Sequence, residues 1–190
     1  FTPDCKGFRG FNLNIGCPSP DIIKTGQGCA LIKRINKVKT LLGIIKDHGY
    51  PASVKMRLGM NRFEKEKKVY LNLINGVDAE FFVVHARHGS ETYADKADFR
   101  VYDECVKTGR TIIANGDIKT KEDVKRLKDA GVKGVMIGRA AITNPLIFSQ
   151  LKGESSPDIN KVKEEFLELS KKFDTPKKFV DNVLKHLGKS

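Results

Sequence analysis

The chain has 190 residues, and its 35 Lys and Arg against 23 Asp and Glu leave a formal net charge of +12 at pH 7. This length suits one domain with a sizeable core, alone or with a small appendage. No apolar run reaches the roughly 18 to 20 residues of a membrane-spanning helix, no signal segment is recognisable, and the four cysteines form no Cys-x-x-Cys pair, so a cytoplasmic protein with no membrane or metal is expected.

The excess positive charge has two interpretations. It favours polyanionic partners, because neutralising a phosphate releases a counterion and raises affinity at low salt. A solvated lysine-rich surface, common in heat-adapted cytosolic proteins, gives the same composition. Composition alone fits both.

Short β-branched runs alternate with amphipathic stretches along most of the chain. Strands are predicted over residues 11–15, 52–56, 81–85, 111–114 and 135–137. Helices are predicted over residues 28–46, 63–74, 99–107 and 120–130, most of them ending at glycine-containing turns. Such alternation requires parallel strands with the helices as crossovers, and therefore an α/β fold.

The pattern changes after Leu151. Two further amphipathic helices are predicted. Val162, Phe166, Leu169 and Phe173 share one face of the first, opposite Lys and Glu, and Phe179, Val183, Leu184 and Leu187 point inward in the second. We therefore divide the chain into residues 1–151 and a helical appendage of residues 152–190. Its many lysines suit either binding to a phosphate backbone or a solvated surface on a segment that covers the barrel.

Polar groups follow every predicted strand. Cys17 stands between Gly16 and Pro18 after the first strand, and the later strands lead to Lys55 and Arg57, His85 and Arg87, Asn115 to Asp117, and Gly138 with Arg139. A doubly wound sheet binds mainly through one glycine-rich turn, whereas a (β/α)8 TIM-type barrel distributes its site among all its loops. The pattern favours the barrel and one shared site. Such a barrel needs three more units, so we expect missing sequence before Phe1.

Six ordered motifs between about residues 11 and 148 resemble those of the tRNA-dihydrouridine synthases. They are Asn14–Pro20 with Gly26–Lys33, Val54–Gly59, His85–Arg87, Tyr93 with Ala97 and Asp98, Asn115–Ile118, and Met136–Ala140 with Asn144 and Pro145. The resemblance implies an FMN-dependent barrel whose strands four to eight are present here. It also implies NADPH or NADH as reductant and tRNA as the partner whose uridine C5–C6 double bond is reduced.

The resemblance also implies roles for individual residues. Cys17 would donate the proton to C5 of uracil, a role that requires a protonated thiol. Lys55 and His85 match positions that contact the flavin, a cation there stabilising the charge of its reduced form. Asn14 and Arg57 match positions that contact the uracil or its nearby backbone. The FMN phosphate would be bound by Asn115, Gly116, Asp117, Gly138 and Arg139.

Two other functions fit parts of the sequence. One is a dihydroorotate-dehydrogenase-like FMN barrel that acts on a free pyrimidine, against which the net charge argues mildly. The other is a non-catalytic RNA-binding module derived from a barrel. Flavin absorbance and the identity of the substrate that is turned over distinguish these two functions from that of a tRNA-dihydrouridine synthase.

Overall fold

The computed structural model describes residues 7–188. Its contacts divide the chain into two compact units. Unit 1 comprises the residues up to Gly116 together with Arg126–Met136, and unit 2 comprises Asp117–Lys125 together with the residues from Ile137 onward. Within the described range, no helix is both long and apolar enough to cross a bilayer. The division into a barrel part and an appendage at residue 152 stays a prediction.

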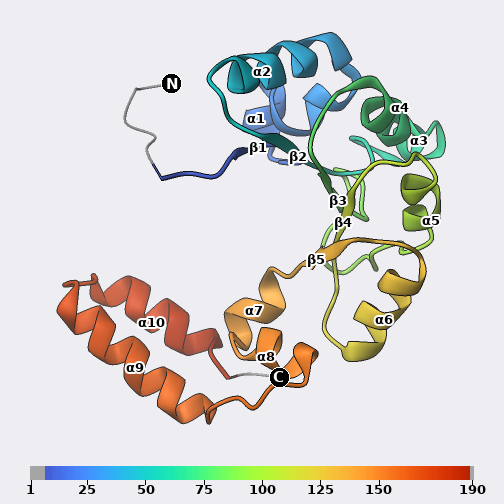
Figure 1. The fold of residues 1–190 in the computed structure, drawn as a ribbon. Coiled ribbons are helices and arrows are strands. Elements are labelled where there is room, and N and C mark those ends of the chain that lie inside the picture. The colour runs from blue at the N-terminus through green and yellow to red at the C-terminus, as the bar shows by residue number, and fades with distance from the viewer. Residues whose placement is uncertain (1–6, 189–190) are drawn as a thin grey trace. The chain divides into compact units, whose positions relative to one another are not determined.

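Unit 1 is built on a parallel sheet of five strands in the order β1-β2-β3-β4-β5 (Figure 1). The strands are β1 (Phe11–Ile15), β2 (Ala52–Met56), β3 (Phe82–His85), β4 (Ile112–Asn115) and β5 (Gly134–Met136). Each strand pairs in parallel with the next along the chain. The α/β class and the five strands predicted from the sequence are therefore confirmed, with ends that differ by one residue at most.

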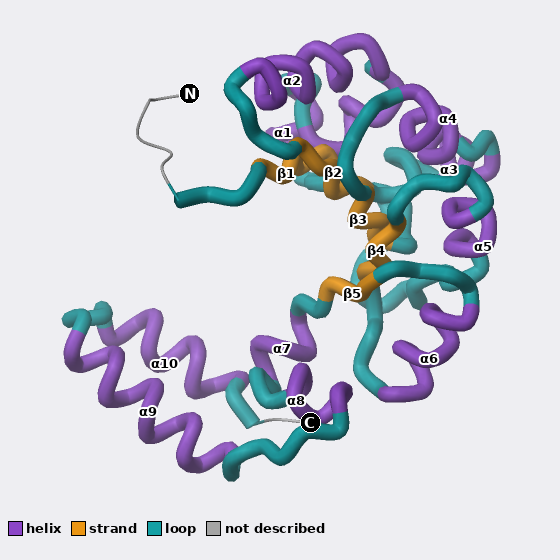
Figure 2. The backbone as a smooth tube through the Cα atoms, viewed as in Figure 1, coloured by secondary structure: helices purple, strands orange, loops and turns teal. Residues whose placement is uncertain are grey.

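The two faces of the sheet differ in chemistry because alternate side chains of a strand point to opposite sides. One face carries apolar residues such as Val54, Phe82 and Ala114, none of them accessible to solvent. Helices α2, α4 and α5 lie on one side of the sheet (Figure 2). The face turned away from the apolar core is the face that carries the polar side chains.

Unit 1 contains seven helical segments among its described residues or at its boundary. They are α1 (Pro20–Lys24), the 3-10 helix η1 (Gly28–Lys33), α2 (Ile35–Asp47), α3 (Arg62–Glu66), α4 (Val69–Gly76), α5 (Val101–Val106) and α6 (Lys121–Asp129). The continuous helices predicted over residues 28–46 and 63–74 are wrong, because each is broken into two. The short helix α1 was not predicted.

The backbone shows where both predicted helices break. Arg34, with φ −97° and ψ 57°, separates η1 from α2. Lys68 takes a left-handed conformation, with φ 53°, between α3 and α4. The Lys68 Nζ lies 2.9 Å from Glu104 Oε2 on α5, a residue 36 positions later in the sequence. The local periodicity of apolar residues does not reveal this turn, because its ion-pair partner is far away along the chain.

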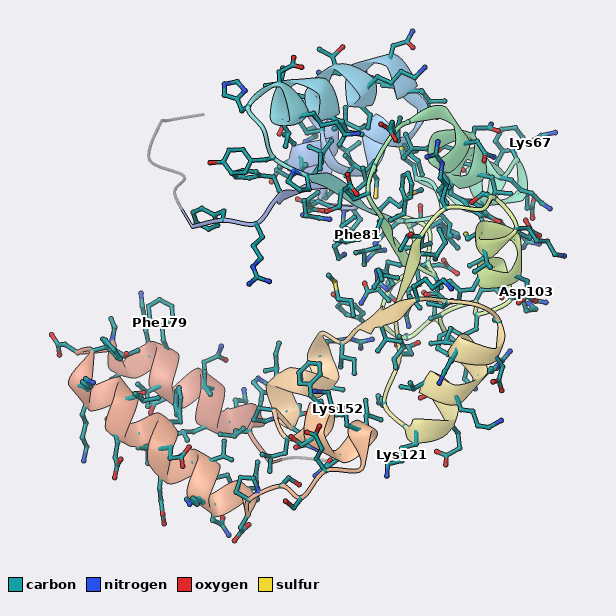
Figure 3. The ribbon with its side chains drawn as sticks, in the orientation of Figure 1. Lys67, Phe81, Asp103, Lys121, Lys152 and Phe179 are labelled. Atoms are coloured by element: carbon teal, nitrogen blue, oxygen red, sulfur yellow. The ribbon has the colours of Figure 1, made fainter. Side chains whose placement is uncertain are left out.

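Unit 2 contains four helices besides its part of α6, namely α7 (Arg139–Thr143), α8 (Ile147–Lys152), α9 (Ile159–Lys172) and α10 (Lys177–His186). The two helices predicted in this region correspond to α9 and α10. α10 packs against α7 and α9. The prediction that Phe179 points inward is wrong, because it is 54% exposed. On the apolar face predicted for α9, Leu169 and Phe173 are 52% and 69% exposed. Figure 3 shows Phe179 projecting from α10, since a pair of helices covers only the sides that meet.

Candidate functional site

The strand register places four of the predicted site residues on the polar face of the sheet. Asn14 of β1 pairs in register with Lys55 of β2, and His85 of β3 with Asn115 of β4. Lys55 is itself opposite Val83, which lies two positions before His85 and therefore on the same face. The sheet thus brings together a cation, an imidazole and two amides that are up to about a hundred residues apart in sequence.

The loop after β1 fixes the position of Cys17 from both sides. Before it, the Gly16 amide N–H donates to Asn14 Oδ1 at 3.1 Å. Beyond it, the Cys17 carbonyl accepts from the Cys29 N–H at 2.9 Å. Gly28 has φ +55°, and a Cβ built on it would stand 2.4 Å from the Cys17 oxygen. Cys17 itself is only partly buried, so its thiol is held at the end of the strand without being enclosed.

Charged groups lie close enough to this loop to shift the pKa values of Lys55 and Cys29. The pKa of Lys55 is lowered, first by its burial and then by the positive charge of Arg57. Burial raises the pKa of Cys29 to about 11, with Cys17 and Glu64 adding to the rise while Arg57 opposes it. Cys29 is 1% exposed and stays a protonated packing residue at neutral pH.

Arg57 supports the loop that follows β3. It is 7% exposed, and its Nη1 donates to the carbonyls of His88 at 2.9 Å and Glu91 at 3.2 Å. The sequence did not indicate this bonding. A direct contact between Arg57 and uracil remains a prediction.

Asn115 and Gly116 form the end of β4. The Asn115 side chain donates from Nδ2 to the Met136 carbonyl at 2.9 Å, which ties β4 to β5. Gly116 has φ +116°, and a Cβ there would stand 3.0 Å from Cδ2 of the His85 ring. Only glycine therefore permits the backbone to lie this close to the imidazole.

Tyr102 of α5 joins the ends of β3 and β4, and its role could not be predicted from the sequence. Its side chain is fully buried, and its hydroxyl lies 3.0 Å from the Val84 carbonyl and 2.8 Å from the Asn115 carbonyl. The same hydroxyl accepts from the Asn115 N–H at 3.0 Å. The strands that carry His85 and Asn115 are thus fixed to each other by one phenol.

Replacing Tyr102 by Phe is expected to lower the free energy of unfolding by about 1 to 3 kcal/mol, because the Asn115 N–H loses the hydroxyl that accepts its hydrogen bond. Urea denaturation measures this change. Tyr93→Phe serves as the control, since Tyr93 is 62% exposed and keeps its ring, and should change stability by less than about 0.5 kcal/mol. Equal unfolding midpoints for the two variants would contradict the assignment.

Three predicted phosphate-binding residues belong to unit 2. Arg139 Nη2 donates to Asp117 Oδ1 at 2.8 Å, and the Arg139 side chain is 49% exposed. Asp117 adopts φ +50°, an uncommon conformation for a non-glycine residue that often marks functional sites. Gly138 directly precedes α7. Their role in phosphate binding remains a prediction.

Arg87 is the main residue of the site to which the sequence assigned no role. It is fully buried at the end of β3, two positions after His85. The sequence did contain a signal for Arg87, because a charged residue stands there two positions after an apolar strand, within the motif His85–Arg87. Across the described residues, no group of three or more His, Cys, Asp or Glu is arranged to hold a metal ion.

Comparison with known proteins identifies the family of the chain. The model of the dihydrouridine synthase family (Dus) matches residues 4–189. A probable tRNA-dihydrouridine synthase of Helicobacter pylori is 34% identical over 154 residues, covering 78% of this chain and 46% of that protein. A probable tRNA-dihydrouridine synthase 2 of Bacillus subtilis is 34% identical over 158 residues, covering 79% of this chain and 48% of that protein.

A human protein named tRNA-dihydrouridine(47) synthase [NAD(P)(+)]-like is 29% identical over 180 residues, which is 93% of this chain and 26% of that protein. The chain therefore spans between about a quarter and a half of the length of these relatives. The match of the family model extends over both compact units. The chain belongs to the dihydrouridine synthase family.

Proposed function

We propose that this chain is part of an FMN-dependent tRNA-dihydrouridine synthase, which reduces the C5–C6 double bond of uridine with electrons from NADPH or NADH. The observation that carries the proposal is the polar face of the sheet, on which Asn14, Lys55 and His85 lie near the carboxyl ends of their strands, while Cys17 follows the end of β1. The names of the relatives support tRNA as substrate and NAD(P) as the source of electrons. A cytoplasmic location stays a prediction.

The residues of unit 1 fit a flavin in two respects. Gly116 lets the backbone lie against His85, since a Cβ there would stand 3.0 Å from the ring, and it thereby helps to fix the imidazole that is proposed to contact the flavin. Lys55 supplies a half-buried cation, which suits the negative charge that reduced FMN carries near N1 and O2. The predicted phosphate contacts of Arg139 and its neighbours rest on the sequence motif.

The chemistry divides between cofactor and chain. When bound, FMN supplies the hydride for C6 of the uracil. Cys17 donates the proton to C5, and the hydrogen bonds at Gly16 and Cys29 hold it in place for this step. Asn14 and Arg57 are proposed to orient the pyrimidine. A uridine in folded tRNA must leave its stack to reach such a site, at a cost of a few kcal/mol.

We further propose that β1 to β5 are the fourth to eighth strands of a (β/α)8 barrel. Support comes from their parallel sequential order and from the helices on one side of the sheet. Among the described residues β1 pairs only with β2, and β5 only with β4. Closure of the sheet therefore requires strands from elsewhere in the protein.

The lysines of α9 and α10 support tRNA as the partner. These two helices carry Lys161, Lys163, Lys171, Lys172, Lys177, Lys178 and Lys185. Exposed Phe173 and Phe179 stand directly beside Lys172 and Lys178, whose Nζ atoms lie 5.6 and 4.9 Å from the ring centroids. Cations combined with exposed rings suit nucleic-acid backbones and bases.

The decisive experiment combines a spectrum with two substrate assays. The purified protein should show the absorbance of a flavin, and with NADPH it should form dihydrouridine in unmodified tRNA. Turnover of free dihydroorotate alone would end the tRNA proposal. A colourless protein that binds tRNA but no FMN would instead indicate a non-catalytic RNA-binding module.

Replacing Arg139 by Ala is expected to raise the dissociation constant of FMN about 10- to 100-fold, because a charge-assisted hydrogen bond to phosphate contributes about 1.5 to 3 kcal/mol. Fluorescence titration of the apoprotein with FMN measures the effect. Lys152→Ala removes an exposed cation of the same unit, 3.9 Å from Glu154, and should leave FMN affinity unchanged. Full FMN affinity in the Arg139 variant would count against the phosphate assignment.

A further inference from the structure

Arg87 is a buried cation that contacts residues around the end of β3. Its Nε donates to the Asp95 carbonyl at 2.8 Å, and its Nη2 donates to the same oxygen. Its Nη1 lies 3.1 Å from Nε2 of His85. Its guanidinium carbon is 6.0 Å from the ring centroid of Tyr93. The arginine therefore joins His85 to the loop that follows it.

The contact between Arg87 and His85 determines where the imidazole carries its proton. A guanidinium has only donors and stays protonated in proteins. His85 Nε2 must therefore accept, and a neutral imidazole that accepts at Nε2 carries its proton on Nδ1. We propose that Arg87 is a positioning residue that fixes His85 as the neutral Nδ1–H tautomer.

The charged groups around His85 oppose a second proton on the ring. Lys55 of β2 and Arg57, which comes directly after the residue that pairs with Val84, both carry positive charge. On the loop that follows β3, Asp95 Oδ2 accepts from Thr92, and Asp98 pairs with Lys65 and Arg100. From β4 and α5, Asn115 and the Tyr102 hydroxyl contribute no charge at neutral pH. An imidazolium would face the Arg87 guanidinium donor to donor, so protonation of Nε2 would cost the hydrogen bond between the two side chains.

The ring is also restricted in orientation. Its Cδ2 and Nε2 would stand 3.0 and 3.4 Å from a Cβ at Gly116, so the backbone of β4 lies against one part of the imidazole. Arg87 holds Nε2. A turned ring would lose this hydrogen bond and leave a buried guanidinium with fewer partners, which is costly.

The consequence concerns the cofactor, and it rests on the proposed function, in which His85 contacts the flavin. Any hydrogen bond from His85 to a bound flavin is donated from Nδ1, so the atom it meets is an acceptor such as a ring carbonyl. The contact also keeps the same form through the pH range in which an ordinary histidine, with a pKa near roughly 6.5, changes charge.

Nitrogen NMR of the full chain with 15N-labelled histidine tests the proposal without any flavin present. The chain has four histidines, and His85→Gln identifies the signals of His85. We expect the shift of an unprotonated Nε2 and of a protonated Nδ1, with no titration between about pH 5 and 8. A proton on Nε2 of His85, or a titration of its signals within that range, would overturn the proposal.

Two variants separate positioning from simple packing. Arg87→Met keeps the length of the side chain but removes the donors, so His85 should populate both tautomers and acquire a titration near pH 6 to 7. Arg87→Lys keeps a buried cation with donors and should preserve the tautomer of the original chain. An unchanged tautomer without titration in the Met variant would refute the role of Arg87. If the Met variant does not fold, the spectra of the original chain and the Lys variant decide the question.

The same protein distinguishes this inference from the proposed function. A chain that shows the Nδ1–H tautomer but binds no FMN supports the role of Arg87 and overturns the flavoenzyme proposal. A chain that binds FMN with a titrating His85 supports the enzyme and overturns the role of Arg87.

Discussion

Replacing Cys17 by Ala is expected to reduce dihydrouridine formation by about 10² to 10⁴-fold, the usual contribution of a positioned general acid. FMN should remain bound, because the main chain of Cys17 keeps its bond with the Cys29 N–H at 2.9 Å whatever the side chain. The measurement is the rate of dihydrouridine formation in unmodified tRNA at saturating NADPH. The flavin spectrum of the same sample reports whether the cofactor is retained.

Cys29→Ala is the matched control for this experiment. Cys29 lies directly beside Cys17 in the structure but is 1% exposed, and burial raises its pKa to about 11. Its loss should change stability modestly while the rate stays within a few-fold. An unaltered rate in the Cys17 variant, or an equal collapse in both variants, would refute the assignment of the proton donor.

Replacing Gly28 by Ala is expected to lower the free energy of unfolding by about 3 kcal/mol and to abolish most activity. The new Cβ would stand 2.4 Å from the Cys17 carbonyl, a backbone atom that cannot rotate away, and φ is +55°. The 3-10 helix η1 or the loop of Cys17 must therefore move. Urea denaturation measures the stability, and the tRNA assay measures the displacement of the thiol.

Gly43→Ala provides the opposite expectation within the same unit. Gly43 lies inside α2, and a Cβ there meets nothing within 4 Å. The substitution should raise the free energy of unfolding by about 0.5 to 1 kcal/mol, because alanine loses less backbone entropy in a helix. A free energy of unfolding that is unchanged or raised in the Gly28 variant would disprove the close approach of Gly28 to Cys17.

The candidate site was partly predictable because parallel strands end at one edge of a sheet. Each polar residue was placed after an apolar strand, and the register confirms that Asn14, Lys55 and His85 share a face. Their predicted contacts with flavin and uracil remain predictions. The bonds that Arg57 makes with the His88 and Glu91 carbonyls could not be foreseen, because they join segments more than thirty positions apart.

The amino-acid pattern by itself determined the five strands, their parallel pairing and the positions of the polar groups at their ends. These depend on the alternation of apolar residues and on the crossover that each helix must make. The tertiary structure alone decided the left-handed turn at Lys68, the phenol of Tyr102 between two strands, and the contact of Arg87 with His85. Each of these features depends on how groups from different segments come together, or on how the backbone turns, when the core is buried. A local sequence pattern does not determine such contacts.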